Sequence, residues 1–226
     1  MHTDGGRILM CGYTPSTQAA LDELGAEIQS RGVILLTQKT VPEREGVTVL
    51  ALDYLHADHL RNPRVELDEC SVCIVFAEPP ADGGPARTTD MRTVLAVYTI
   101  KKERPDLPMI AEVVDRENTS FIEELDCDDV IFKETIDSNL ITSCILHPNI
   151  SPIFYDLLTV RGKTLRSTTL ADLGMDDPDV TYRDIRLRGL EQDVTYLGFI
   201  DRSHGVQLMP PNDTVIRPTF RLVYIE

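Results

Sequence analysis

Short apolar segments alternate with helical segments along the first 146 residues, and this alternation limits the fold more than any other feature. The segment at 71–77 is almost wholly apolar, which is typical of a parallel strand covered on both faces. The segment at 88–104 places Met91, Leu95 and Tyr98 at helical spacing and ends before a proline. Strands are expected at 7–12, 32–37, 46–52, 71–77, 109–114 and 130–132, and helices at 15–24, 53–60, 88–104, 119–125 and 136–146. This order predicts an α/β fold with a doubly wound, Rossmann-like parallel sheet.

The pattern changes beyond residue 158, where short β-rich segments are separated by turn residues rather than by long helices. Strands are expected there at 180–188, 195–200, 205–209 and 220–225. The sequence therefore predicts a small β-rich subdomain after the parallel sheet. The expected organisation is a Rossmann-like domain at 7–148, a crossover helix at 149–160 and the β-rich subdomain at 161–226.

The charge of the chain is strongly acidic, with 22 Lys and Arg against 37 Asp and Glu and a formal net charge of −15. Residues 1–160 hold 13 basic and 27 acidic side chains, whereas residues 161–226 hold 9 and 10. Nucleic acids and anionic membranes need clustered Lys and Arg, so we expect neither as a partner. The acidity favours a divalent cation as ligand, unless it serves solubility alone.

The cellular compartment is inferred from three features that the sequence lacks. The longest apolar runs, at 33–36 and 72–77, are far shorter than the roughly 20 residues of a membrane-spanning helix, and the polar start lacks a signal-peptide segment. Five Cys, an odd number, lie mostly in apolar segments and do not form a disulfide framework. We expect a cytoplasmic protein without direct membrane insertion.

The first strand and the helix after it are joined by a turn that departs from the dinucleotide-binding pattern. That pattern is G-x-G-x-x-G, and here only Gly12 remains, because Thr14 and Thr17 take the places of the other two glycines. Residues 37–39 also lack the acid that binds a ribose. NAD is therefore not expected. The candidate anion or nucleotide site is Gly12, Tyr13, Thr14, Ser16 and Thr17, whose hydroxyls either hold a phosphate or carboxylate or cap the helix.

An apolar stripe occupies one face of the expected helix at 149–160. Its residues follow i, i+3, i+4, i+7, i+8 spacing: Ile150, Ile153, Phe154, Leu157 and Leu158. Such a stripe either packs into a core or pairs with another helix. Because the helix lies between the two expected domains, we expect it to form a homodimer interface.

Several stretches occur in the order seen in one known family. They are 8–24, 72–76, 90–95, 108–113, 117–118 and 129–131. These stretches resemble the RCK domains, the regulators of potassium conductance. Residues 150–158 resemble the crossover helix through which two RCK domains pair, and residues 161–226 resemble the small RCK subdomain. Residues 180–185 and 197–200 are also similar to the Castor and Pollux ion channels.

The resemblance implies a homodimer or ring under a potassium channel pore domain, which changes its arrangement when a ligand binds. The resemblance places a metal-binding acid at Glu112. The chain resembles the branch of the family that lacks the second and third glycines of the turn, and this branch includes calcium-activated channels. Glu78, Asp82, Asp115 and Glu117 are expected near the same sheet edge and complete the candidate Ca²⁺ site. Val114 and Phe76 stand where the family has further acids. Glu112 is therefore either a metal ligand or a structural acid paired with Arg116 or a backbone amide.

No catalytic pattern is present: the sequence has no Ser-His-Asp arrangement, no phosphate-binding loop with Lys and no H-E-x-x-H. We expect a non-enzymatic, cytosolic RCK-type regulatory domain that senses Ca²⁺ or another cation and couples it to pore gating. The alternative is a nucleotide-binding regulatory subunit of a Trk-type potassium transporter, or a nucleotide-dependent enzyme on the same fold.

Overall fold

The computed structural model describes residues 5–80, 86–159, 164–175, 177–201 and 205–226. By its internal contacts the chain divides into two compact units, Met1–Thr142 and Ser143–Glu226. Each unit has its own apolar core. Among the described residues, no helix is both long and apolar enough to cross a membrane.

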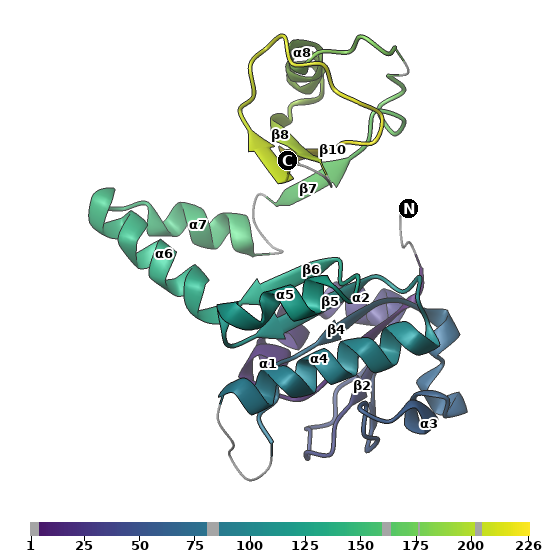
Figure 1. Ribbon diagram of the computed structural model, residues 1–226. Helices are drawn as coiled ribbons and strands as arrows, with labels where there is room; N and C mark the ends of the chain where they lie inside the picture. Colours follow the sequence, from purple (N-terminus) through teal and green to yellow (C-terminus); the bar gives the residue numbers. More distant parts are fainter. Residues whose placement is uncertain (1–4, 81–85, 160–163, 176, 202–204) are drawn as a thin grey trace. The chain divides into compact units, whose positions relative to one another are not determined.

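Unit 1 is built on a six-stranded, wholly parallel sheet with the strand order β3-β2-β1-β4-β5-β6 (Figure 1). Its strands are β1 Arg7–Cys11, β2 Val33–Leu36, β3 Val47–Leu50, β4 Cys70–Val75, β5 Met109–Val113 and β6 Asp129–Phe132. Its helices are α1 Pro15–Glu23, α2 Gly25–Arg31, α3 Ala57–Leu60, α4 Ala86–Glu103 and α5 Thr119–Glu123, with short 3-10 turns η1 Pro63–Val65, η2 Leu67–Glu69 and η3 Arg116–Asn118. Helix α6, Lys133–Leu146, follows β6 and continues past residue 142. The predicted doubly wound sheet is confirmed.

Both faces of the sheet are covered by helices, which explains why its central strands are apolar throughout. Leu9 and Cys11 of β1 belong to the core shared with α4 and α5, whereas Ile8 and Met10 belong to the core shared with α1 and α2 (Figure 1). Successive residues of a strand point to opposite faces, so a strand covered on both sides has no polar face. All four of these side chains are buried.

The strand order places β1 between β2 and β4 at the centre of the sheet. The chain runs outward from β1 to β3 in one direction and then from β4 to β6 in the other. The carboxyl ends of β1 and β4 therefore meet where the order reverses, which is the usual position of a ligand site in an open α/β sheet.

Unit 2 begins with the end of α6 and with α7, Ser151–Leu158, and continues into a four-stranded antiparallel sheet of order β7-β10-β8-β9. Its other elements are β7 Leu165–Thr168, α8 Tyr182–Gln192, β8 Thr195–Asp201, β9 Gly205–Leu208 and β10 Arg221–Ile225. Phe199 of β8 stacks on Phe220 with ring centroids 4.6 Å apart in the core of this unit.

One predicted element of unit 2 was wrong and one strand was missed. The expected strand at 180–188 is instead helix α8, whose buried residues Tyr182, Ile185 and Gly189 follow helical spacing. Its first turn is fixed by the Asp184 carboxylate, which accepts hydrogen bonds from the N–H and the hydroxyl of Thr181 at 2.8 and 2.6 Å. The missed strand, β7, is a short edge strand in which two of four residues are exposed.

Candidate functional site

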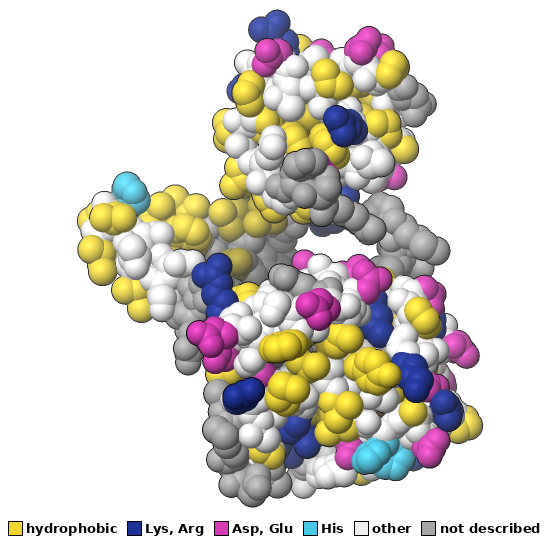
Figure 2. All heavy atoms as spheres, viewed as in Figure 1, with side chains coloured by type: hydrophobic (Ala, Val, Ile, Leu, Met, Phe, Trp, Pro, Cys, Tyr) yellow, Lys and Arg dark blue, Asp and Glu magenta, His cyan; other side chains and the backbone are white. Residues whose placement is uncertain are grey.

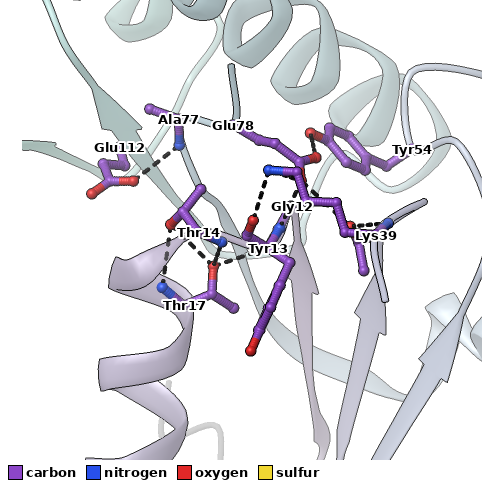
Figure 3. Close-up of polar contacts among 10 residues, drawn as sticks. Gly12, Tyr13, Thr14, Thr17, Lys39, Tyr54, Ala77, Glu78 and Glu112 are labelled. Atoms are coloured by element: carbon purple, nitrogen blue, oxygen red, sulfur yellow. Dashed lines mark hydrogen bonds and ion pairs between the residues drawn. The ribbon is translucent and has the colours of Figure 1, made fainter. Parts of the chain in front are cut away.

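The turn between β1 and α1 lies at the reversal point of the sheet and is closed by its own side chains (Figure 3). Thr14 and Thr17 form a reciprocal capping box: Thr14 N–H donates to Thr17 Oγ1 at 3.0 Å, and Thr17 N–H donates to Thr14 Oγ1 at 3.3 Å. The Thr17 hydroxyl also donates to the carbonyl of Gly12 at 3.0 Å. The hydroxyls of Thr14 and Thr17 therefore cap α1.

Gly12 is required in this turn for two reasons. Its φ is +91°, a conformation that residues with a side chain rarely adopt. A Cβ at this position would also lie 3.1 Å from the Cβ of Glu78 and 3.3 Å from the carbonyl oxygen of Phe76. The glycine therefore allows the segment after β4 to lie directly against the turn.

Glu78 follows β4 and directs its carboxylate into this turn (Figure 3). Its Oε1 accepts a hydrogen bond from the N–H of Tyr13 and pairs with Lys39 Nζ, both at 3.1 Å, and lies 3.4 Å from the Thr37 hydroxyl. Its Oε2 accepts a hydrogen bond from the Tyr54 hydroxyl at 3.1 Å. The Glu78 side chain is only 8% exposed, so this carboxylate is a buried charge held by donors from three other segments of the chain.

Tyr54 shows the electrostatic effect of this arrangement. Burial is the largest cause that raises the pKa of its hydroxyl, and the negative charge of Glu78 raises it further. The hydroxyl therefore stays protonated and remains a hydrogen-bond donor to Glu78. Lys39 also donates from Nζ to the carbonyl of Tyr13 at 3.1 Å. Its ammonium group therefore binds both the backbone of the turn and the carboxylate of Glu78.

Glu112, in β5, is bound on the other side of the turn. The hydroxyl of Ser16, in the first turn of α1, donates to Glu112 Oε1 at 2.7 Å. The N–H of Ala77 donates to Oε2 at 3.0 Å, as Figure 3 shows. The side chain is buried. Of the two predicted roles, a structural acid bonded to a backbone amide agrees with these contacts, although the amide belongs to Ala77 and Arg116 makes no bond to Glu112 that we observe.

Two of the other predicted metal ligands, Asp115 and Glu117, form no metal-binding group with Glu78 and Glu112. Asp115 and Glu117 are exposed, and the Asp115 carboxylate accepts the N–H of Glu117 at 3.0 Å as the cap of η3. Asp82 lies outside the described residues. Within the described ranges, no group of three or more His, Cys, Asp or Glu side chains is placed to hold a metal ion.

Asp90 is a buried acid of the same sheet edge that the sequence analysis missed. This residue of α4 is 0% exposed, and its carboxylate accepts the N–H of Val114 at 2.8 Å and the N–H of Asp115 at 2.9 Å. The Nδ2 of Asn118 donates to the same carboxylate at 2.8 Å. An acid in the first turns of a long amphipathic helix normally faces water. The sequence therefore gives no sign that Asp90 is a buried hydrogen-bond acceptor.

The predicted pairing stripe lies on and just before α7, and its residues are not part of a core. Ile153 and Leu158 are 59% and 62% exposed, while Ile150, Phe154 and Leu157 are half-buried. Ile145 and Leu146, at the end of α6, are also exposed. Figure 2 shows hydrophobic side chains gathered along α6 and α7. Among the described residues, the stripe is not part of the apolar core of unit 2.

A second exposed apolar patch lies on unit 1. It consists of Met91, Leu95 and Tyr98 on α4 with Phe121 on the neighbouring α5, each about half exposed. Figure 2 shows this patch on the face of unit 1 that α4 and α5 cover. The three α4 residues follow i, i+4, i+7 spacing, so they form one stripe of that helix.

Comparison with known proteins gives matches among solved structures only. No family model matches the sequence, and no curated protein does. The human SLO3 gating ring aligns with 97% of this chain and 43% of its own length, at 14% identity and a TM-score of 0.72. The GsuK RCK domain aligns with 99% of this chain and 44% of its own, at 18% identity and a TM-score of 0.51. The GsuK channel bound to NAD aligns with 98% and 36%, at 16% identity and a TM-score of 0.52.

These alignments show that the chain has the fold of RCK domains, as predicted from the sequence. The chain spans less than half of the length of these three structures.

Proposed function

We propose that this chain is an RCK-type regulatory domain of a potassium channel, which pairs with a second copy and transmits a change of arrangement to the pore. The observation that carries the proposal is the exposed apolar stripe of α7. A helix with this much apolar surface in water is stabilised by a partner helix, because burying the stripe removes that surface from water. The fold shared with the human SLO3 gating ring supports a regulatory role.

Ring assembly needs a second contact surface besides the pairing helix. A pair formed through α7 alone is closed, since each copy uses the same patch on the other. The patch of Met91, Leu95, Tyr98 and Phe121 belongs to unit 1 and supplies a second surface. We propose that pairs join through this patch into a ring on the cytosolic side of the membrane, and that the domain has no catalytic role of its own.

The ligand class that we propose for this regulator is a cation, because the acidity is concentrated in residues 1–160. Glu78 and Glu112 already have donors from the chain, so we assign them a structural role instead of a place in the cation site. A ligand changes the balance between two arrangements only by the difference in its affinity for them. The cation therefore has to bind where the spacing of two parts or two copies changes.

Nucleotide sensing is the second candidate function. GsuK structures bound to NAD and to ADP have a related fold, with TM-scores of 0.52 and 0.50. The β1–α1 turn of this chain, however, lacks the second and third glycines and has its donors engaged. Absorbance near 260 nm of the purified protein, before and after unfolding, tests for a retained nucleotide; its presence would favour this candidate.

Patch-clamp recording of the channel that carries this chain tests the proposed function. We expect Ile153→Asp to abolish the ligand-dependent change in open probability, because it places a charge in the pairing stripe. Leu187→Asp is the matched control: Leu187 is also in unit 2 and is 55% exposed, but it lies on α8, so gating should be retained. Unchanged gating in Ile153→Asp would contradict the proposal.

A further inference from the structure

The β1–α1 turn is the place where a nucleotide-binding domain of this fold donates backbone N–H groups to phosphate oxygens. Here those groups are engaged by the chain itself. Gly12 N–H donates to the carbonyl of Leu36, and Tyr13 N–H donates to Glu78. The N–H groups of Thr14 and Thr17 donate to each other's hydroxyls, and Pro15 has no N–H.

Glu78 differs from the other partners of the turn because it brings a full negative charge. Its carboxylate contacts three groups that suit an anion: the N–H of Tyr13, the ammonium of Lys39 and the hydroxyl of Tyr54. All three donors lie 3.1 Å from a carboxylate oxygen. Charge-assisted bonds of this kind are also the ones that hold a phosphate.

The space beside Glu78 is small while this side chain is in place. A crevice of about 240 Å³ is lined by Lys39, Asp53, Tyr54, Glu78 and Arg92, among others. This volume is below the roughly 300–1,000 Å³ of typical ligand pockets. Arg92 also contributes a buried Nε that has no hydrogen-bond partner among the described residues. The crevice thus holds two cationic side chains, Lys39 and Arg92, against two acidic ones, Glu78 and Asp53, so that without Glu78 its charge is positive.

We propose that the Glu78 carboxylate is an internal anion that fills the phosphate position of this turn and thereby excludes nucleotides. Glu78 is then the specificity-determining residue of the site: it supplies from within the chain the charge that a nucleotide would supply from outside. Its removal leaves an N–H, an ammonium and a hydroxyl that converge on an empty position. The remaining side chains then favour a phosphate anion.

Isothermal titration calorimetry with inorganic pyrophosphate and with ADP tests this proposal on the full chain. The wild type should bind neither measurably, and Glu78→Ala should bind at least tenfold more tightly. The matched control is Glu112→Ala, which removes the neighbouring buried acid but leaves Tyr13 N–H and Lys39 engaged, so it should not gain binding. The double variant Glu78→Ala/Lys39→Ala should lose the gain, because the cation is then absent.

Two results would overturn the proposal: wild-type binding as tight as that of Glu78→Ala, or no tighter binding by Glu78→Ala than by Glu112→Ala. If circular dichroism shows that Glu78→Ala is unfolded, Glu78→Gln is tested in its place, since it removes the charge but keeps the shape of the side chain. A gain in pyrophosphate binding is again expected, and no gain overturns the proposal. These measurements do not depend on pairing, so a monomeric chain would contradict the proposed function and leave this test intact.

Discussion

The hydroxyl of Ser16 donates a 2.7 Å hydrogen bond to the carboxylate of Glu112, a residue 96 positions further along the chain. This bond joins the first turn of α1 to β5, although β4 separates β1 from β5 in the sheet. Glu112 also accepts the N–H of Ala77 after β4. One buried acid of β5 therefore connects the first turn of α1 with the segment that follows β4.

Glu112→Gln should lower the free energy of unfolding by about 1–2 kcal/mol, because bonds to a charged acceptor become bonds to a neutral amide. Chemical denaturation of both proteins measures the change. Glu43→Gln, at an exposed position, is the control and should have little effect. A stability equal to that of the wild type would show that the buried charge does not hold these segments together.

Calcium should raise the melting temperature of the wild type and of Glu112→Gln by the same amount, whatever that amount is. The reason is that Glu112 is already held by Ser16 and Ala77 and is not a ligand of the cation in our account. Thermal unfolding in chelator and in excess calcium gives both shifts. A shift that is present in the wild type and lost in Glu112→Gln would instead make Glu112 a calcium ligand.

Asp90→Ala should destabilise unit 1 by roughly 2–4 kcal/mol, because it leaves the buried Asn118 amide and two backbone N–H groups without their acceptor. Urea unfolding followed by circular dichroism measures this loss. Asp106→Ala is a suitable control, since Asp106 is exposed and pairs with Arg104 at the surface. Equal stabilities of the two variants would contradict the role assigned to Asp90.

The acid stability of unit 2 should depend on Asp184. The hydroxyl of Thr181, and next its backbone N–H, hold the pKa of Asp184 below its usual value. A lowered folded-state pKa means that the carboxylate stabilises the fold above about pH 4 and that this contribution is lost as the pH falls further. Asp184→Asn should therefore melt below the wild type at neutral pH, and the gap should close in acid.

Thermal unfolding of wild type and Asp184→Asn across this pH range checks the sign of the effect. Asp193→Asn is the matched control at the other end of α8: this residue has φ +58°, which Asn tolerates well. Its melting temperature should be close to that of the wild type at neutral pH. A gap for Asp184→Asn that stays constant down to low pH would rule out the titration of this carboxylate as the cause.

Much of unit 1 could be predicted from the sequence, because its strands are continuous apolar runs and its helices have a clear 3.6-residue period. The same reasoning placed Glu78 and Glu112 at one edge of the sheet. The partners of these acids could not be predicted, since Glu78 contacts Lys39 and Tyr13, which lie 39 and 65 positions before it in the sequence. Only the strand order brings those residues together, and local patterns do not encode that order.

Unit 2 was harder to predict because its segments satisfy two periods at once. Val180 and Tyr182 alternate with the polar Thr181 and Arg183 as in a strand, whereas Tyr182, Ile185 and Gly189 follow the spacing of a helix. The hydrogen bonds of Asp184 to Thr181 favour the helix. Gly189 reads as a turn residue in sequence, yet it lies within α8, where a Cβ would meet the carbonyl of Val194 at 2.7 Å.

The molar mass of the chain in solution, measured by light scattering after gel filtration, tests the central claim most directly. We expect twice the 25.3 kDa of one chain or a higher multiple for the wild type and for Leu187→Asp, and a lower mass for Ile153→Asp, which loses the α7 contact. A wild type that remains a single chain at the highest concentration reached would contradict pairing through α7 and, with it, the proposed regulatory assembly.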